Sequence, residues 1–207
     1  MVRSSFLGFA AVILTVMLVF SGGCAQSKPT KFYVLHSMLD ARTSAQLEGQ
    51  DFFIGVGPVK IADYLDRPQM ITRKGESSLE LAEFDRWAEP LDRNLTRTIS
   101  GNLTVLLHTE NIISFPWPKA ARPKYQVTIG VVRMDGMLGG KVVLDARWMI
   151  LSVEEEKALL TKRSFIEIPT LTADYDGFAL AMSTAVETLS REIASSIGAI
   201  RTTQPGG

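Results

Sequence analysis

The side chains that could act as nucleophiles or metal ligands are few and scattered. Cys24 is the only cysteine, and the two histidines, His36 and His108, lie on separate predicted elements. Neither histidine has metal-ligand spacing to another His, Cys or Asp, and the one thiol directly follows an apolar N-terminal run. The sequence therefore predicts no zinc site, no Cys/His catalysis and no bound cofactor.

Motifs for phosphate binding and acid–base catalysis are also incomplete. Gly55-Val56-Gly57 follows a predicted strand, but no third glycine opens a helix, so the dinucleotide fingerprint fails. No Gly-x-Ser-x-Gly elbow is present. Asp85 and Glu89 bracket an arginine and a tryptophan, which favours ion pairing over a glycosidase-like acid pair. We predict a non-enzymatic protein. The alternative at this point is a periplasmic hydrolase that uses Asp85 and Glu89, and loss of activity when either residue is substituted would support it.

The N-terminus has the layout of an export signal. Arg3 precedes the uncharged run 6–20, then Ser21-Gly22-Gly23 and Cys24 follow. As a helix this run would span roughly 22 Å, short of the ~30 Å hydrocarbon core. A basic flank, a short apolar run and small residues are typical of a secretory signal. A cysteine at this point predicts a lipoprotein, in which diacylglycerol alkylates the thiol before cleavage makes Cys24 the first residue.

Two alternatives stay open for this segment, and the neighbours of Cys24 bear on them. A plain cleaved signal or an uncleaved apolar anchor would also export the chain, and Ser21 stands where lipoprotein signals usually have leucine. A lone thiol in an oxidising periplasm favours lipidation, because no second cysteine could pair with it. Ala25, rather than aspartate, at the second mature position favours the periplasmic face of the outer membrane.

The rest of the chain predicts one domain. We expect a signal peptide at 1–23, a lipidated tether at 24–31, one periplasmic domain at 32–201 and a disordered tail at 202–207. The 22 basic and 22 acidic residues cancel, so nothing in the charge favours nucleic acid binding.

Hydrophobic periodicity predicts two helices. Apolar residues recur every four positions from Leu91 to about His108, after Pro90, which suits a first helical turn. A second apolar stripe runs from Asp176 to Ile200, and Asp174 or Asp176 could cap its start.

The remaining periodic segments predict strands. Short ones are expected at 32–35 and 52–61 and in a hairpin of 69–73 with 79–82, and 37–50 is expected to be a loop. Longer ones are expected at 125–134, 142–153 and 159–168, where Leu144, Ala146, Trp148 and Ile150 share one face. The sum predicts an α+β fold, a mostly antiparallel sheet with the two main helices packed on one face.

Two short non-periodic stretches combine aromatic, arginine and proline residues. They are Tyr64-Leu65-Asp66-Arg67-Pro68 and 84–91, which contains Arg86-Trp87-Ala88-Glu89-Pro90. Aromatic residues with arginine are favoured at protein interfaces. A loop fixed to its own core by Trp87 and Tyr64 is the equal alternative.

These stretches carry a resemblance to the ABC-type transport auxiliary lipoprotein family of membrane integrity-associated transporter subunits. Val56-Gly57-Pro58-Val59 with 64–73 is similar to its first motif, and 86–91 with Asn102-Leu103 to its second. Pro116-Trp117-Pro118 is similar to the third motif and 189–194 to the C-terminal helix. The candidate partner-binding or motif residues on this basis are Gly57, Pro58, Tyr64, Leu65, Asp66, Arg67, Pro68, Arg86, Trp87, Glu89, Pro90 and Trp117.

The resemblance implies a docking subunit of a lipid-transport system that maintains the cell envelope. Its implied partners are a periplasmic or inner-membrane MCE-domain protein and ABC or membrane-embedded transporter subunits, and self-association into a homo-oligomer is a further expectation. The alternative is a carrier that holds lipid in a cavity of its own.

Overall fold

The computed structural model describes residues 28–38, 52–118 and 120–203. In chain order its elements are β1 (Lys31–Tyr33), β2 (Phe53–Ile61), the 3-10 helix η1 (Asp63–Leu65), β3 (Gln69–Arg73), β4 (Leu79–Trp87), α2 (Leu91–Leu106), β5 (Ile112–Ser114), β6 (Pro123–Gly136), β7 (Lys141–Ser152), β8 (Lys157–Pro169) and α3 (Tyr175–Thr203). The predicted α+β class is confirmed.

The strands form two sheets rather than the single sheet that we predicted. One has five strands in the order β5-β2-β6-β7-β8, and the other has three in the order β1-β4-β3. Consecutive hairpins make β6, β7 and β8 antiparallel. β2 pairs in parallel with β5 and β6, and β1 with β4, so the antiparallel character is only partial. The parallel pairs follow from connectivity, because the intervening elements return the chain to the same end of the sheet.

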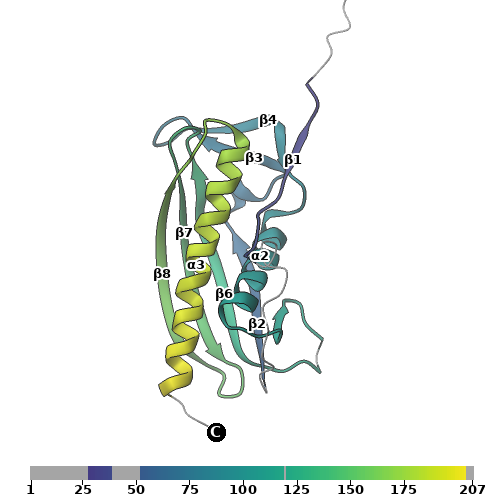
Figure 1. Ribbon diagram of the computed structural model, residues 1–207, viewed down its shortest axis with the longest axis vertical. Coiled ribbons are helices and arrows are strands. Elements are labelled where there is room, and N and C mark those ends of the chain that lie inside the picture. Colours follow the sequence, from purple (N-terminus) through teal and green to yellow (C-terminus); the bar gives the residue numbers. More distant parts are fainter. Residues whose placement is uncertain (1–27, 39–51, 119, 204–207) are drawn as a thin grey trace, which may run out of the picture.

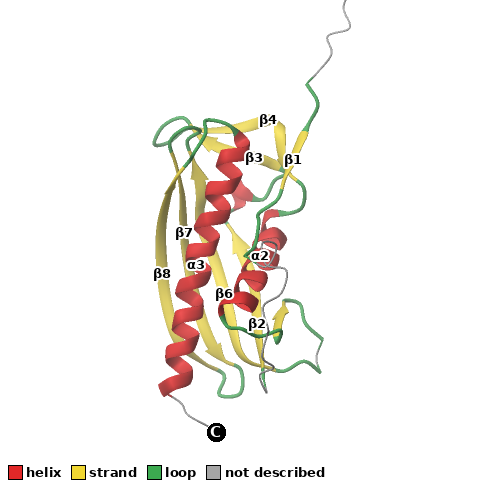
Figure 2. Cartoon of the chain, viewed as in Figure 1, coloured by secondary structure: helices red, strands yellow, loops and turns green. Residues whose placement is uncertain are grey.

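Both helices lie on one face of the five-stranded sheet (Figures 1 and 2). α3 crosses in front of β7 and β8, and α2 lies in front of β2 beside it. On β7 the predicted inner face is confirmed, because Leu144, Ala146, Trp148 and Ile150 are all buried. On the opposite face Arg147 is exposed, whereas Asp145 is buried and paired with Arg163.

The helix boundaries have local causes. Leu91, Leu95, Ile99 and Leu103 of α2 are all buried, so the stripe of every fourth residue faces the core. At the start of α3 the Asp174 carboxylate accepts a hydrogen bond from the backbone N–H of Gly177 at 2.8 Å. This carboxylate satisfies one of the free amides of the first turn.

After β1 the chain runs between the two helices, fixed by buried asparagines. The N–H of Leu35 donates to Asn94 Oδ1 at 3.1 Å, and the N–H of Met38 donates to Asn102 Oδ1 at 2.7 Å. The Asn102 amide also donates to Ser190 Oγ of α3 at 3.1 Å. The N-terminal segment is therefore bonded into the domain through side chains, both at Leu35, where we expected the strand 32–35 to end, and at Met38, in the expected loop.

Several predictions fall at or beyond the ends of the described ranges. The signal peptide, Cys24, the first half of the tether, most of the 37–50 loop and the last four residues lie outside the described residues. Lys31, which we placed at the end of the tether, begins β1. Thr202 and Thr203, which we placed in the tail, form the end of α3.

Candidate functional site

The first motif stretch is fixed to the domain by one buried carboxylate. Leu65 lies in the core, and the Tyr64 hydroxyl donates to Asp135 Oδ2 at 2.9 Å. Asp135 also accepts two hydrogen bonds from Arg73, at 2.9 and 2.8 Å, and one from Arg133 at 2.8 Å. Asp135 is fully buried, so this cluster joins η1, β3 and β6 through one charge.

Burial and hydrogen bonding within this cluster shift the pKa values of Asp135 and Tyr64. Burial alone would raise the pKa of Asp135, but hydrogen bonds from its three donors outweigh burial and hold that pKa below its usual value. Burial, reinforced by the Asp135 carboxylate, raises the pKa of Tyr64 to about 12. Tyr64 therefore stays a neutral donor, and its role is to position the loop that follows it.

The second motif stretch divides between the core and the surface. Trp87 is buried, and its backbone N–H donates to the carbonyl of Pro68 at 2.7 Å. Glu89 reaches outward to Arg97 of α2, with contacts of 3.1 and 3.0 Å. Arg86 is partly buried, and its Nε has no hydrogen-bond partner among the described residues.

These two stretches meet in a shallow depression, which we name the Arg67 hollow. It measures about 270 Å³ and is lined by Asp66, Arg67, Pro68, Trp87, Ala88, Glu89 and Pro90. The structure thus brings together residues 66–68 of the first stretch and 87–90 of the second, which are about 20 residues apart in the chain. Among these lining residues Trp87 is buried and Arg67 is exposed.

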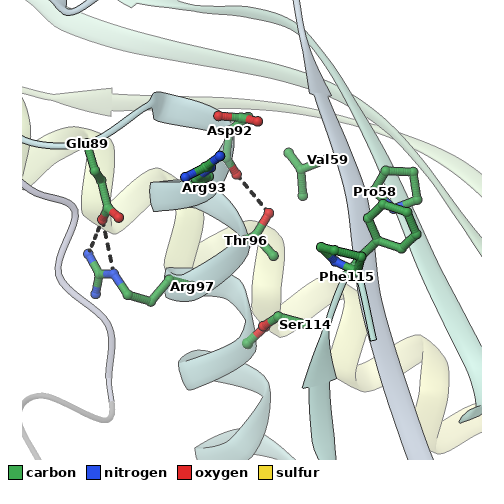
Figure 3. A pocket seen from close by; sticks show the side chains of 11 residues that line it. Pro58, Val59, Glu89, Asp92, Arg93, Thr96, Arg97, Ser114 and Phe115 are labelled. Atoms are coloured by element: carbon green, nitrogen blue, oxygen red, sulfur yellow. Dashed lines mark hydrogen bonds and ion pairs between the residues drawn. The ribbon is translucent and has the colours of Figure 1, made fainter. Parts of the chain in front are cut away.

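A larger groove shares Glu89 with this hollow, and we name it the α2 groove (Figure 3). It measures about 560 Å³. Its lining residues come from β2, from α2 and from the end of β5: Pro58, Val59, Glu89, Asp92, Arg93, Thr96, Arg97, Ser100, Ser114, Phe115 and Pro116. Figure 3 shows Pro58 and Phe115 side by side on one wall, opposite the polar side of α2.

The polar wall of the α2 groove is ordered by local bonds, with one exception. Arg97 pairs with Glu89, and its Nη2 also donates to Asn94 at 3.0 Å. The Thr96 hydroxyl donates to the carbonyl of Asp92 at 2.7 Å. Arg93 is exposed, and within the described ranges its guanidinium has no ion pair or hydrogen bond. It is the cation of this wall that remains available to a ligand.

Trp117 of the third motif packs against the apolar wall that Pro58 and Phe115 form. Trp117 packs edge-on against Phe115, with ring centroids 5.4 Å apart. Its ring lies over Gly55, where a Cβ would come within 2.7 Å of it. Gly57 has a φ of +113°, which suits glycine alone, and directly precedes Pro58 of the groove. Gly57 and Pro58 therefore lie at the same wall as Trp117, which follows them about 60 residues later in the chain.

Sequence reasoning assigned no supporting role to the residues that hold these two surfaces, although Asn102 was named within the second motif. Asn94 and Asn102 are fully buried and hold the segment after β1, and Asp135 holds η1. Phe115 forms much of the apolar wall. For the two asparagines a signal did exist, because a polar residue next to the apolar stripe of a helix needs a buried hydrogen-bond partner.

Three further observations concern the described residues. Within them, no three His, Asp or Glu side chains gather as a metal site would require. Asp85 accepts a hydrogen bond from the Tyr33 hydroxyl at 2.7 Å, and Glu89 is paired with Arg97. Across the same residues, no helix combines the length and the hydropathy needed to cross a bilayer.

One known protein family matches most of this chain. The family described as ABC-type transport auxiliary lipoprotein component matches residues 33–194. Among curated proteins, the intermembrane transport lipoprotein PqiC of Escherichia coli (strain K12) is 23% identical over 153 residues, covering 74% of this chain and 78% of that protein. The protein of the same name from Shigella flexneri matches with the same identity and coverage.

Solved structures share the fold at low sequence identity. A protein from Xanthomonas campestris superposes with a TM-score of 0.68 at 14% identity, covering 84% of this chain and all of that one. A second, uncharacterised protein gives a TM-score of 0.67 at 19% identity, covering 82% of this chain and 99% of that one. The arrangement of sheets and helices described above therefore recurs in solved structures.

Proposed function

Because the chain belongs to the ABC-type transport auxiliary lipoprotein component family, we propose that it is a non-enzymatic docking subunit of a lipid-transport system. Cys24 would hold it at the periplasmic face of the outer membrane, and the α2 groove with the Arg67 hollow would bind the partner. The partner class that we propose is an MCE-domain protein, which links the subunit to ABC or membrane-embedded transporter subunits. Transport of this kind would maintain the cell envelope.

The observation that supports this proposal is the convergence of the motif residues. Arg67, Pro68, Glu89 and Pro90 line one depression, and Glu89 and Pro58 line the next. The two surfaces meet at Glu89 and place exposed arginines beside exposed aromatic and proline side chains. Aromatic and arginine side chains are the residues that most often carry the binding energy of protein interfaces.

The geometry favours docking over the alternative of a lipid carrier. A carrier needs a cavity lined mainly by apolar side chains and large enough to bury an acyl chain. The α2 groove is open at the surface, and one wall carries Asp92, Arg93 and Arg97. Extraction of the purified protein followed by mass spectrometry would test the alternative, since a stoichiometric bound lipid would contradict docking as the sole role.

A bulky residue in the α2 groove is expected to abolish partner capture. Thr96→Trp would fill the groove between α2 and Phe115 without touching the buried face of the helix, because Thr96 lies on the groove side. We expect the yield of an MCE-domain protein, captured from envelope extract by the tagged full-length chain, to fall at least tenfold, which corresponds to about 1.4 kcal/mol.

Thr104→Trp is the matched control for this experiment. Thr104 and Thr96 are both partly exposed residues of α2, and each hydroxyl donates to the carbonyl four residues earlier. Only Thr96 lines the groove. Equal capture by both variants would place the partner elsewhere, and capture of a second copy of this chain alone would point to self-association instead.

A further inference from the structure

The α2 groove lies beside a strand edge that has no neighbour. β5 pairs with β2 only as far as Ser114 opposite Val56, and the N–H of Phe115 makes the last bond, to the Val56 carbonyl at 2.8 Å. Pro116 then takes the chain away, whereas β2 continues to Ile61. Past Val56, β2 is paired on its β6 side alone within the described sheet.

The register with β6 shows which backbone groups face this edge. The N–H of Ala62 donates to the carbonyl of Val131, so Ala62 and Lys60 direct their backbone groups toward β6. Because the direction alternates along a strand, the N–H and C=O groups of Val59 and Ile61 face the other way. These are the donors and acceptors that a further strand would need.

The groove reaches the beginning of the open edge. Pro58 and Val59 of β2 line the groove, and the Val59 side chain points toward α2 (Figure 3). The arrow of β5 ends at Ser114 and is directed into the space between β2 and α2. One end of the groove is closed by the hydrogen bond between Ser100 Oγ and Ser114 Oγ at 2.9 Å.

We propose that an extended segment of the partner protein adds to this sheet as a strand, in line with β5 and alongside Val59–Ile61 of β2. The inference rests on the proposed docking function and gives the form that the docked segment takes. An unpaired strand edge is complementary to one kind of ligand, an extended backbone that offers alternating C=O and N–H groups. At about 3.3 Å per residue, three to five residues of the segment would fit.

Charge adds a second requirement for the segment. Arg93 lies in the first turn of α2, where the helix dipole disfavours a cation, and it has no partner among the described residues. A carboxylate on the docked strand would pair with Arg93 across the groove. Side chains on the other side of that strand would contact Pro58 and Phe115, which favours an apolar residue there. The segment is therefore extended, free of proline and mixed apolar and acidic.

The test uses random octapeptides displayed on phage and selected against the full-length chain in detergent. Peptides whose binding is lost in Thr96→Trp and kept in Thr104→Trp are those that occupy the groove. Each is then resynthesised with N-methyl groups on alternate amides, in both registers, which removes the donors of one strand edge and keeps every side chain.

Strand addition predicts three results for these peptides. Methylation in one register should weaken binding at least tenfold, and in the other register should leave it unchanged. The amide protons of Val59 and Ile61, followed by NMR, should exchange at least tenfold more slowly when peptide is bound. Arg93→Glu should weaken the binding of peptides that contain an acidic residue. Arg122→Glu should not, because Arg122 is an exposed arginine that is remote in sequence from α2.

Three outcomes would overturn the proposal. The first is that no selected peptide depends on Thr96. The second is that groove-bound peptides tolerate methylation in both registers or leave the exchange of Val59 and Ile61 unchanged. The third is that the amide exchange of Val59 and Ile61 slows when the protein concentration is raised without peptide, because a second copy of the chain then fills the groove. None of these decides whether the Thr96→Trp variant captures an MCE-domain protein, so the two proposals can fail separately.

Discussion

Replacing Asp135 with alanine is expected to lower the free energy of unfolding by about 3–5 kcal/mol, because it leaves two partly buried cationic groups and a buried cavity without the carboxylate. Arg73, Arg133 and Tyr64 all donate to this carboxylate, which is fully buried. The Arg73 side chain is 19% exposed, so it cannot regain full hydration when the carboxylate is lost. Equilibrium unfolding in urea, followed by far-UV circular dichroism, measures the change.

Asp145→Ala is the matched control for this prediction. Asp145 lies on the same outer side of the sheet and is also buried, and it accepts two hydrogen bonds from Arg163 at 2.8 and 2.6 Å. The Arg163 side chain is 58% exposed, so water can solvate it after the substitution. We expect a loss of about 1 kcal/mol. Equal losses in the two variants would show that burial of the partners is not what matters.

The same cluster predicts how stability depends on pH. The pKa of Asp135 is held below its usual value in the folded state, so its contribution is present above the unfolded value of about 3.9 and is lost as the pH falls. The pKa of Tyr64 is raised to about 12, so its contribution is present below about 10 and is lost as the pH rises toward 12. Asp135→Asn should flatten the acid limb of the curve, and Tyr64→Phe the alkaline limb.

The elements with a strong period and their antiparallel hairpin pairings were predictable, and the parallel pairings were not. The stripe from Leu91 to Leu103 and the alternation around Trp148 each bury one face, so local periodicity sufficed for α2 and β7. β5 has three residues, too few to establish a period, and its pairing with β2 is parallel and non-local. Without β5 in the prediction, the open edge beyond Val56 could not be foreseen.

The site shows the same division between local and long-range information. The sequence singled out 64–68 and 84–91 by composition, and residues of both stretches do line one depression. It could not separate the members that fix the loop, Leu65 and Trp87, from those that remain exposed, Arg67 and Pro68, because burial depends on contacts made elsewhere in the chain. Arg93 went unnoticed, because a charged residue on a helix is usually only a solvated one.

Cys24→Ser is expected to release the protein from the membrane altogether. Four Cα–Cα steps lead from Cys24 to Lys28, where the described structure begins. At most about 3.6 Å per residue, they reach roughly 14 Å, so a lipid on Cys24 would hold the β1 end of the domain close to the bilayer. From there the chain is tied in through β1–β4 pairing and through Asn94 and Asn102.

Detergent partitioning, sedimentation with outer membranes and the mass of the mature protein together measure this release. The serine variant should leave the detergent phase, since it lacks the acyl chains that supply about 0.8 kcal/mol per buried CH₂. Unchanged partitioning with an uncleaved N-terminus would mean that the apolar run 6–20 is the anchor. A wild-type protein that is already cleaved and carries no lipid mass would instead indicate a plain signal peptide.

Ala25→Asp is the variant that separates anchoring from sorting. It leaves Cys24 in place, so the protein should keep its lipid mass and its partitioning into detergent. Since aspartate at the second mature position favours inner-membrane retention, we expect the protein to move to inner-membrane fractions on a density gradient. It should then fail to support the envelope even though its α2 groove is intact, because the docking surface would stand at the wrong membrane. An Ala25→Asp protein that stays with the outer membrane would argue that sorting depends on other residues.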